Sequence, residues 1–101
     1  MDLLVRIKRA VLRGNIIFTT KAIEESRSDG LTADDVREAI LSASAIYKSI
    51  RSQSTLARRR EMLHIIYGMT LTGIVVYTKG KLIAVGGVET YYVFVSAKRS
   101  D

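Results

Sequence analysis

The sequence predicts a single α+β domain in which N-terminal helices pack on a C-terminal antiparallel sheet. Before Ala45, apolar residues recur at helical spacing, and capping or stop residues separate the segments. From Ala45 onward the apolar period falls toward two, and β-branched and aromatic residues dominate. A chain of 101 residues leaves no room for a second core, so we expect one domain over 1–101.

The first predicted helix follows Asp2, a possible N-cap, and stops at Gly14. Apolar residues recur along one side, and the basic residues fall elsewhere. The apolar residues are Leu3, Leu4, Ile7 and Val11, and the basic ones are Arg6, Lys8, Arg9 and Arg13. A basic amphipathic helix can bind a membrane or a partner, but this apolar stripe is narrow, so we expect packing on the chain's own sheet.

A short extended run at 16–18 separates this helix from the second. Thr20 can cap the second helix, which ends at Asp29 and Gly30. Before the third helix, a hydrophobic staple accompanies a capping-box variant built from Thr32 and Asp35. The apolar face of this third helix consists of Val36, Ala39, Ile40 and Ala43.

The second half is expected to form the sheet, with candidate strands at 45–51, 60–68, 73–78, 81–86 and 90–98. A two-residue hairpin is predicted at Lys79-Gly80, and Gly86-Gly87 marks another reversal of the chain. Links this short join antiparallel neighbours. Helices on one face of such a sheet would leave the other face available for binding.

The charge balance favours a polyanionic partner. Lys and Arg number 16 against 10 Asp and Glu, a formal charge of +6, and nucleic acid comes first among partners of such a domain. The alternative is that the charge only keeps a small domain soluble. The absence of cysteine indicates a cytoplasmic location, and no apolar run approaches the roughly 20 residues that span a bilayer, so no membrane partner is expected.

Lys48 is the first candidate for a functional side chain. Alternation through Ile46, Lys48 and Ile50 places its ammonium group on an apolar face of the sheet. A charge in that position indicates a ligand, or a lysine whose stem covers apolar surface while its ammonium group reaches water at the sheet edge.

His64, the only histidine, is the second candidate, in a strand that is apolar on both sides. Without cysteine or a second histidine, we expect no metal site and no other cofactor. An ordinary histidine pKa of about 6.5 suits acid or base catalysis near neutrality. The alternative is a core histidine with both ring nitrogens hydrogen-bonded.

Arginines and tyrosines supply further candidates. Of the triplet at 58–60, Arg58 and Arg60 share one face and can hold phosphate, although an arginine-rich strand end is also ordinary solvated surface. Tyrosines beside cations suit single-stranded RNA, since bases stack on the rings while cations bind phosphates, but tyrosine is also a favoured strand residue. The five tyrosines are Tyr47, Tyr67, Tyr77, Tyr91 and Tyr92.

Five strings carry a resemblance that extends from Val11 to Lys98: VLRGNIIFTTKA, LTADDVREAIL, AIYKSI, LTGIVVYTKGKL and YYVFVSAK. In this order they resemble the MqsR-like toxins, the motility quorum-sensing regulator group of the RelE/ParE-like superfamily. A wider group of uncharacterised RelE-like domains is also similar. The hairpin expected at Lys79-Gly80 and the Gly86-Gly87 turn depart from the toxins by lengthening the sheet.

Three family active-site positions match Lys48, Tyr77 and Lys98. Where the family has a glutamine, this chain has His64. The resemblance therefore implies a catalytic set of Lys48, His64, Tyr77 and Lys98. The candidates for RNA contact are Tyr47, Arg51, Arg58, Arg60 and Arg99.

The resemblance implies a RelE-like fold and a toxin of a type II toxin–antitoxin system. Such a toxin is a metal-independent mRNA interferase, an endoribonuclease, that a cognate antitoxin protein neutralises. The alternative is a non-catalytic module of the same fold that binds RNA or a protein partner. DNA is a third candidate partner, but no recognition helix with base-reading side chains stands out.

Overall fold

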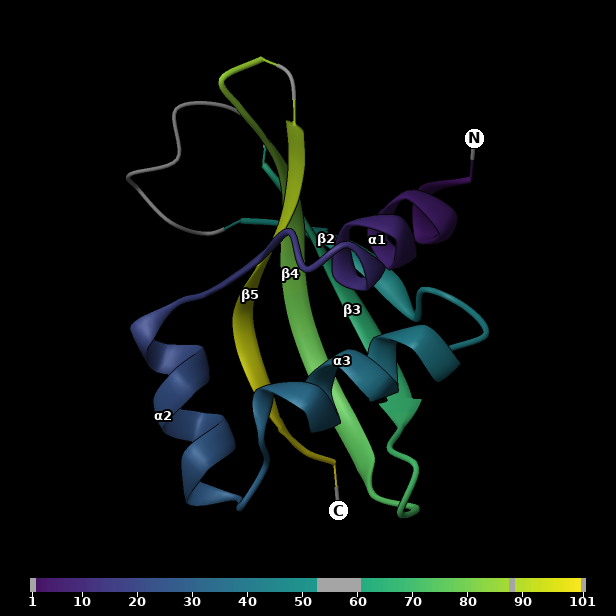
Figure 1. Cartoon of the computed structure of the whole chain (residues 1–101), viewed down its shortest axis with the longest axis vertical. Coiled ribbons are helices and arrows are strands. Elements are labelled where there is room, and N and C mark those ends of the chain that lie inside the picture. The colour runs from purple at the N-terminus through teal and green to yellow at the C-terminus, as the bar shows by residue number, and fades with distance from the viewer. Residues whose placement is uncertain (1, 53–60, 88, 101) are drawn as a thin grey trace.

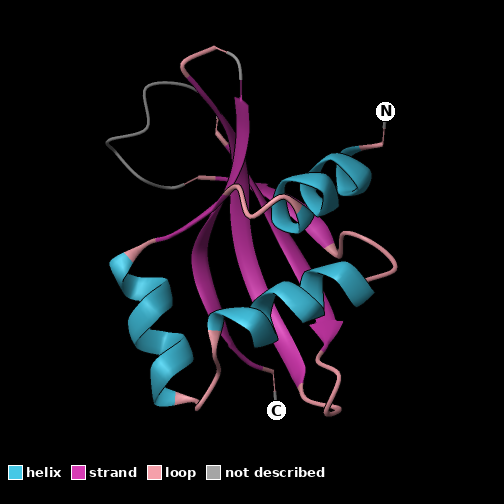
Figure 2. Ribbon diagram, in the orientation of Figure 1, coloured by secondary structure: helices cyan, strands magenta, loops and turns pink. Residues whose placement is uncertain are grey.

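The computed structural model describes residues 2–52, 61–87 and 89–100, and these form three helices and one five-stranded sheet. Figure 1 shows their arrangement, and Figure 2 separates helices from strands. The α+β class predicted from the sequence is confirmed. In chain order the elements are α1 (Leu3–Leu12), β1 (Ile16–Phe18), α2 (Thr20–Ser28), α3 (Ala33–Ser42), β2 (Lys48–Arg51), β3 (Met62–Met69), β4 (Val75–Val85) and β5 (Glu89–Arg99).

The sheet is mixed, with the strand order β1-β5-β4-β3-β2. Strands β2 to β5 pair antiparallel, as predicted, but β1 pairs parallel with β5, so the expectation of a purely antiparallel sheet is wrong. The reason is long-range: Phe18 lies opposite Phe94, and their rings stack with centroids 4.8 Å apart. No local turn signal connects segments so distant in the chain.

Strand β4 continues through Lys79 and Gly80, so the hairpin predicted there is wrong. Gly80 pairs with both neighbouring strands, and a Cβ at this position would overlap the ring of Tyr92. The glycine therefore permits a close approach rather than a turn. The register shifts beside it, which leaves Val95 as the extra residue of a β-bulge. The reversal predicted at Gly86-Gly87 is confirmed, and both glycines have positive φ.

The main core lies between the helices and the sheet. Ile7, Val11, Val36 and Ile40 pack with strand residues such as Ile66. Helix α3 contacts β3 and β4, while α1 contacts β5 and α3. In Figure 1, α1 and α3 lie across the same face of the sheet, and α2 lies beside β5.

Helix α3 lies close against the sheet backbone at Gly68 in β3. A Cβ built there would overlap the carbonyl group of Ala39 in α3. Only glycine allows this contact, because hydrogen replaces the side chain that would separate helix from strand.

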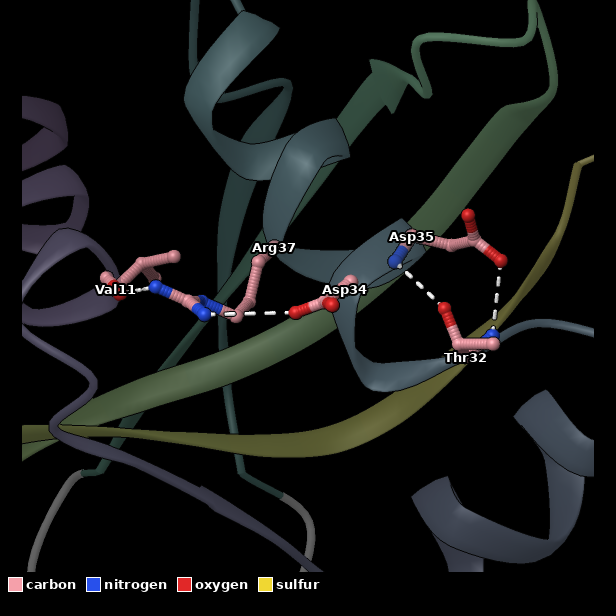
Figure 3. A network of polar contacts seen from close by, with 5 residues as sticks. All are labelled: Val11, Thr32, Asp34, Asp35 and Arg37. Carbon is pink, nitrogen blue, oxygen red and sulfur yellow. Dashed lines mark hydrogen bonds and ion pairs between the residues drawn. The ribbon is translucent and has the colours of Figure 1, made fainter.

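Helices α1 and α3 also cap each other's C-termini. Lys8 of α1 donates hydrogen bonds to the carbonyl oxygens of Leu41 and Ala43, at 3.1 and 2.5 Å. In return Arg37 of α3 donates to the carbonyl oxygen of Val11 at 3.2 Å, as Figure 3 shows. Each cation thus satisfies carbonyl groups at a helix end that lack partners within their own helix.

The N-terminal caps agree with the sequence in two of three helices. Asp2 accepts from the Leu4 amide, and Thr32 and Asp35 form the capping box at α3 seen in Figure 3. Helix α2 is capped by Thr19 instead of Thr20. Thr19 accepts from the Ala22 amide while its hydroxyl donates to the carbonyl oxygen of Val95, so a tertiary contact selects the capping residue.

Two carboxylates, one in α2 and one on its C-cap residue, cover the edge of β5 beyond the short strand β1. Glu25 accepts hydrogen bonds from the Ser96 hydroxyl and the Ala97 amide, and Asp29 accepts from the Arg99 amide. These two amides point out of the sheet, where another strand would otherwise pair. The carboxylates satisfy them and close this stretch of edge.

Candidate nucleic-acid interface

Three neighbouring side chains, one each from β3, β4 and β5, lie on the face of the sheet turned away from α1 and α3. We call this face the outer face. Tyr67 lies between Ile66, which packs in the helix-side core, and Gly68, which contacts α3. Its side chain must therefore point to the outer face. By the same alternation Tyr77 and Lys98 point there from β4 and β5.

These residues form a row across the sheet. Tyr67, Tyr77 and Lys98 are register partners on successive strands. Tyr47, just before β2, packs edge-on against Tyr67 with ring centroids 5.3 Å apart, and Tyr67 packs edge-on against Tyr77 at 5.5 Å. We call Tyr47, Tyr67 and Tyr77 the tyrosine row.

A lysine stands at each end of the tyrosine row. The Nζ atom of Lys48 lies 5.9 Å from the ring centroid of Tyr47, and that of Lys98 lies 5.4 Å from the centroid of Tyr77. Both are within the distance at which an ammonium group interacts with an aromatic face. Lys48 pairs with Ile65, whose place in β3 puts the lysine on the outer face.

The tyrosine row is accessible to a ligand, and its Tyr77 keeps the hydroxyl proton near neutrality. Tyr47 is 66% exposed and Tyr67 38%. The pKa of Tyr77 is raised, mainly by burial and further by the nearby Tyr67 and Glu25. Tyr77 is therefore a hydrogen-bond donor at neutral pH, beside the cation of Lys98.

The two lysines are far apart on the same face. Lys48 lies on β2 and Lys98 on β5, three strand spacings away, a separation of roughly 14 Å. The structure thus brings Tyr77 and Lys98 together and places Lys48 with Tyr47 at the opposite end. In this arrangement the two ammonium groups lie over different rings, Lys48 over Tyr47 and Lys98 over Tyr77, and not at one common point.

His64 lies on the opposite face of the sheet from the tyrosine row. Two residues before Ile66 in the same strand, it points to the helix side and is 7% exposed. Its Nδ1 atom lies 2.7 Å from the hydroxyl of Ser49, its register partner in β2. Burial lowers the pKa of His64, which favours the neutral ring.

The predicted arginines do not join the tyrosine row either. Arg51 follows Ser49 by two residues, so alternation places it on the face of His64, and it is exposed. Arg99 follows Lys98 and points away from it, while its amide is held by Asp29. Arg58 and Arg60 lie outside the described residues.

The sequence indicated the tyrosines only as a group and missed the acidic neighbours of Lys98. A hollow of about 320 Å³ is lined by Glu24, Glu25, Ser28, Asp29 and Lys98. The sequence shows only that these acidic residues belong to a helical segment. Their position beside β5 depends on how α2 packs on that strand. The field at this end of the row is therefore mixed, whereas Lys79 adds positive charge near the middle of the outer face.

No family model, curated protein or solved structure matches the chain. Among the described residues, no helix is both long and apolar enough to cross a membrane. The same ranges hold no group of three His, Asp or Glu side chains that could bind a metal ion.

Proposed function

We propose that this protein binds single-stranded RNA across its outer face, with bases on the tyrosine row and phosphates on the flanking lysines. The observation that carries the proposal is the continuity of Lys48, Tyr47, Tyr67, Tyr77 and Lys98 over four neighbouring segments. Aromatic platforms with cations alongside bind single strands, because every base has a face that can stack and every nucleotide a phosphate.

Fluorescence anisotropy with a labelled unstructured RNA tests this binding. Replacing Tyr67 by Leu removes the ring at the centre of the row and should weaken binding about 5- to 150-fold, since stacking contributes roughly 1–3 kcal/mol per base. Tyr67→Phe keeps the ring and is the matched control. Equal affinity of the Leu and Phe variants would reject stacking on this row.

Cleavage of the bound RNA is a second candidate function, favoured by the contact between Lys98 and Tyr77. In this mechanism the ribose 2′-oxygen attacks the adjacent phosphorus, the bond to the 5′-oxygen breaks, and a 2′,3′-cyclic phosphate forms. The 2′-hydroxyl proton passes to solvent. Tyr77 gives its proton to the departing 5′-oxygen, and Lys98 stabilises the charge on the phosphoryl oxygens.

This second function corresponds to a toxin of a type II toxin–antitoxin system with a RelE-like fold, in the cytoplasm and neutralised by a cognate antitoxin. Two of the residues predicted to be catalytic have other roles in this mechanism, because of where they lie. Lys48 would hold a flanking phosphate at the far end of the row, and His64 would take no part because it points to the other face.

Incubation of pure protein with labelled RNA in EDTA tests cleavage. Lys98→Met and Tyr77→Phe should each slow product formation, by about 10²- to 10³-fold for the lysine. His64→Gln should cleave at the rate of the unmodified protein. Binding without cleavage would leave the RNA-binding proposal standing and reject the nuclease, whereas equal cleavage by all variants would indicate a contaminating enzyme.

A further inference from the structure

Helix α1 carries a stripe of three arginines on its solvent side. Its buried residues are Leu4, Ile7, Ala10 and Val11, and its other side exposes Arg6, Arg9 and Arg13. The spacings of three and four residues place these guanidinium groups along one line. From Arg6 to Arg13, the C-cap residue of α1, the line covers seven residue steps, about 10.5 Å at the rise of a helix.

The three guanidinium groups have no hydrogen bond or ion pair with any other part of the chain that the structure describes. Two other basic residues nearby do make such contacts. Lys8 and Arg37 are used in capping α3 and α1, and Arg37 also pairs with Asp34 at 3.5 Å. The arginine stripe is thus a line of charge that serves no intramolecular contact among these residues.

We propose that the arginine stripe, defined as Arg6, Arg9 and Arg13, binds the phosphate backbone of duplex nucleic acid. A rigid helix holds the cations in a fixed line, which suits a regular array of phosphates. One strand of a B-form duplex presents a phosphate about every 3.4 Å along its axis, so the stripe spans about three of them. Guanidinium groups bind phosphate oxygens in a bidentate manner.

Single strands and membranes fit the stripe less well. Helix α1 has no aromatic side chain on which an unpaired base could stack. Its apolar side is buried in its own core, which leaves only Val5 and Leu12, 41% and 67% exposed, for insertion into lipid. The arginine stripe is therefore best suited to bind the phosphates of a nucleic-acid backbone, whose charge is opposite to its own.

The stripe is separate from the tyrosine row. Helix α1 packs on the helix-side face of the sheet, and its arginines point away from that sheet, whereas the row lies on the outer face. The proposal therefore does not depend on RNA binding by the row. If both hold, one molecule contacts a paired and an unpaired segment on opposite sides.

Titration of blunt duplexes of roughly 20 base pairs, one of RNA and one of DNA, tests the stripe by fluorescence anisotropy at several salt concentrations. Binding through three phosphates gives a slope of log K against log salt of about −2.7. The double variant Arg6→Gln/Arg9→Gln should reduce the size of this slope by about 2 and weaken binding at least tenfold. Binding of both duplexes indicates recognition of the shared backbone, and binding of RNA alone indicates the A-form.

The matched control is Lys21→Gln/Arg27→Gln, which removes the same charge from exposed positions on α2. It should bind duplex like the unmodified protein, and an equal loss in both double variants would reject the stripe. So would binding to phosphatidylserine-containing vesicles without binding to either duplex. Tyr67→Leu should leave duplex binding unchanged, so failure of the stripe and failure of the tyrosine row give different results. Circular dichroism checks that each variant keeps its helices.

Discussion

The ring of Tyr92 is fully buried at the centre of the core, but its hydroxyl group has no hydrogen-bond partner among the described residues. The ring lies over Gly80 and meets Phe94 edge-on at 5.1 Å. Burial raises the pKa of this phenol, which therefore stays protonated. The ring stabilises the fold by packing, whereas the unpaired hydroxyl opposes folding.

Tyr92→Phe should leave the free energy of unfolding unchanged or increase it by about 1 kcal/mol, because the ring stays and an unsatisfied polar group is removed. Urea denaturation measures this difference. Tyr92→Leu is the control and should destabilise, since the ring contacts are lost. A clear loss of stability in the Phe variant would mean that the hydroxyl has a partner.

His64 makes stability depend on pH. Its pKa in the folded protein is below the ordinary value of 6.5, so the unfolded chain binds the proton more readily. The contribution of the neutral ring to the free energy of unfolding is complete above pH 6.5. It is lost as the pH falls from there through the lower pKa of the folded protein. Unfolding free energies between pH 8 and about pH 5 should therefore decline, and His64→Gln should show a shallower decline. Parallel curves for both proteins would contradict this assignment.

At the scale of elements, α1 and α3 are joined by their reciprocal caps as well as by core packing. Lys8→Met removes both hydrogen bonds to the end of α3 and should cost about 1–2 kcal/mol of unfolding free energy. Lys21→Met on the exposed side of α2 is the control for loss of one charge. Thermal or urea denaturation compares the two, and equal small effects would show that the Lys8 contacts contribute nothing.

The contact between α3 and β3 depends on the missing side chain of Gly68. Gly68→Ala places a methyl group against the Ala39 carbonyl group, so helix and strand must separate, at a cost of about 3 kcal/mol. Met69→Ala, at the exposed neighbour, should cost much less. Near-native stability of the Ala variant would mean that α3 can shift without loss of packing.

For the whole molecule, we expect helices and sheet to unfold together. The N-terminal strand β1 completes the sheet beside β5, and the main core joins helix and strand residues. All five tyrosines lie between 47 and 92, in the sheet half, while the helices lie within 3–42. Tyrosine fluorescence and far-ultraviolet circular dichroism should therefore give the same denaturation midpoint, and separate midpoints would contradict a single cooperative unit.

Local signals account for the parts of the fold predicted from sequence. Helical spacing and capping residues indicated α1 and α3, and period-two segments indicated β2, β3 and β5. The parallel pairing of β1 could not be predicted, because it depends on packing between Phe18 and Phe94. The Lys79-Gly80 string gives a turn signal, but the ring of Tyr92 requires glycine there for space.

The candidate site divides in the same way. Alternation within β3 is enough to place His64 and Tyr67 on opposite faces once the strand is known. Strand order and pairing register cannot be read from the sequence. Strand order separates Lys48 from Lys98, and register brings Tyr77 beside Lys98. The local sequence pattern therefore determines which face a side chain occupies, and long-range packing determines which side chains lie beside it.

The position of β5 has a consequence for synthesis of the protein on the ribosome. This strand is made last among the elements, yet it lies inside the sheet, between β1, from the start of the chain, and β4. Until translation has passed Arg99 and the strand has emerged, β1 has no neighbour and the helices lack part of the surface they cover. The sheet and the helices that cover it can therefore complete their packing only after β5 has left the ribosome.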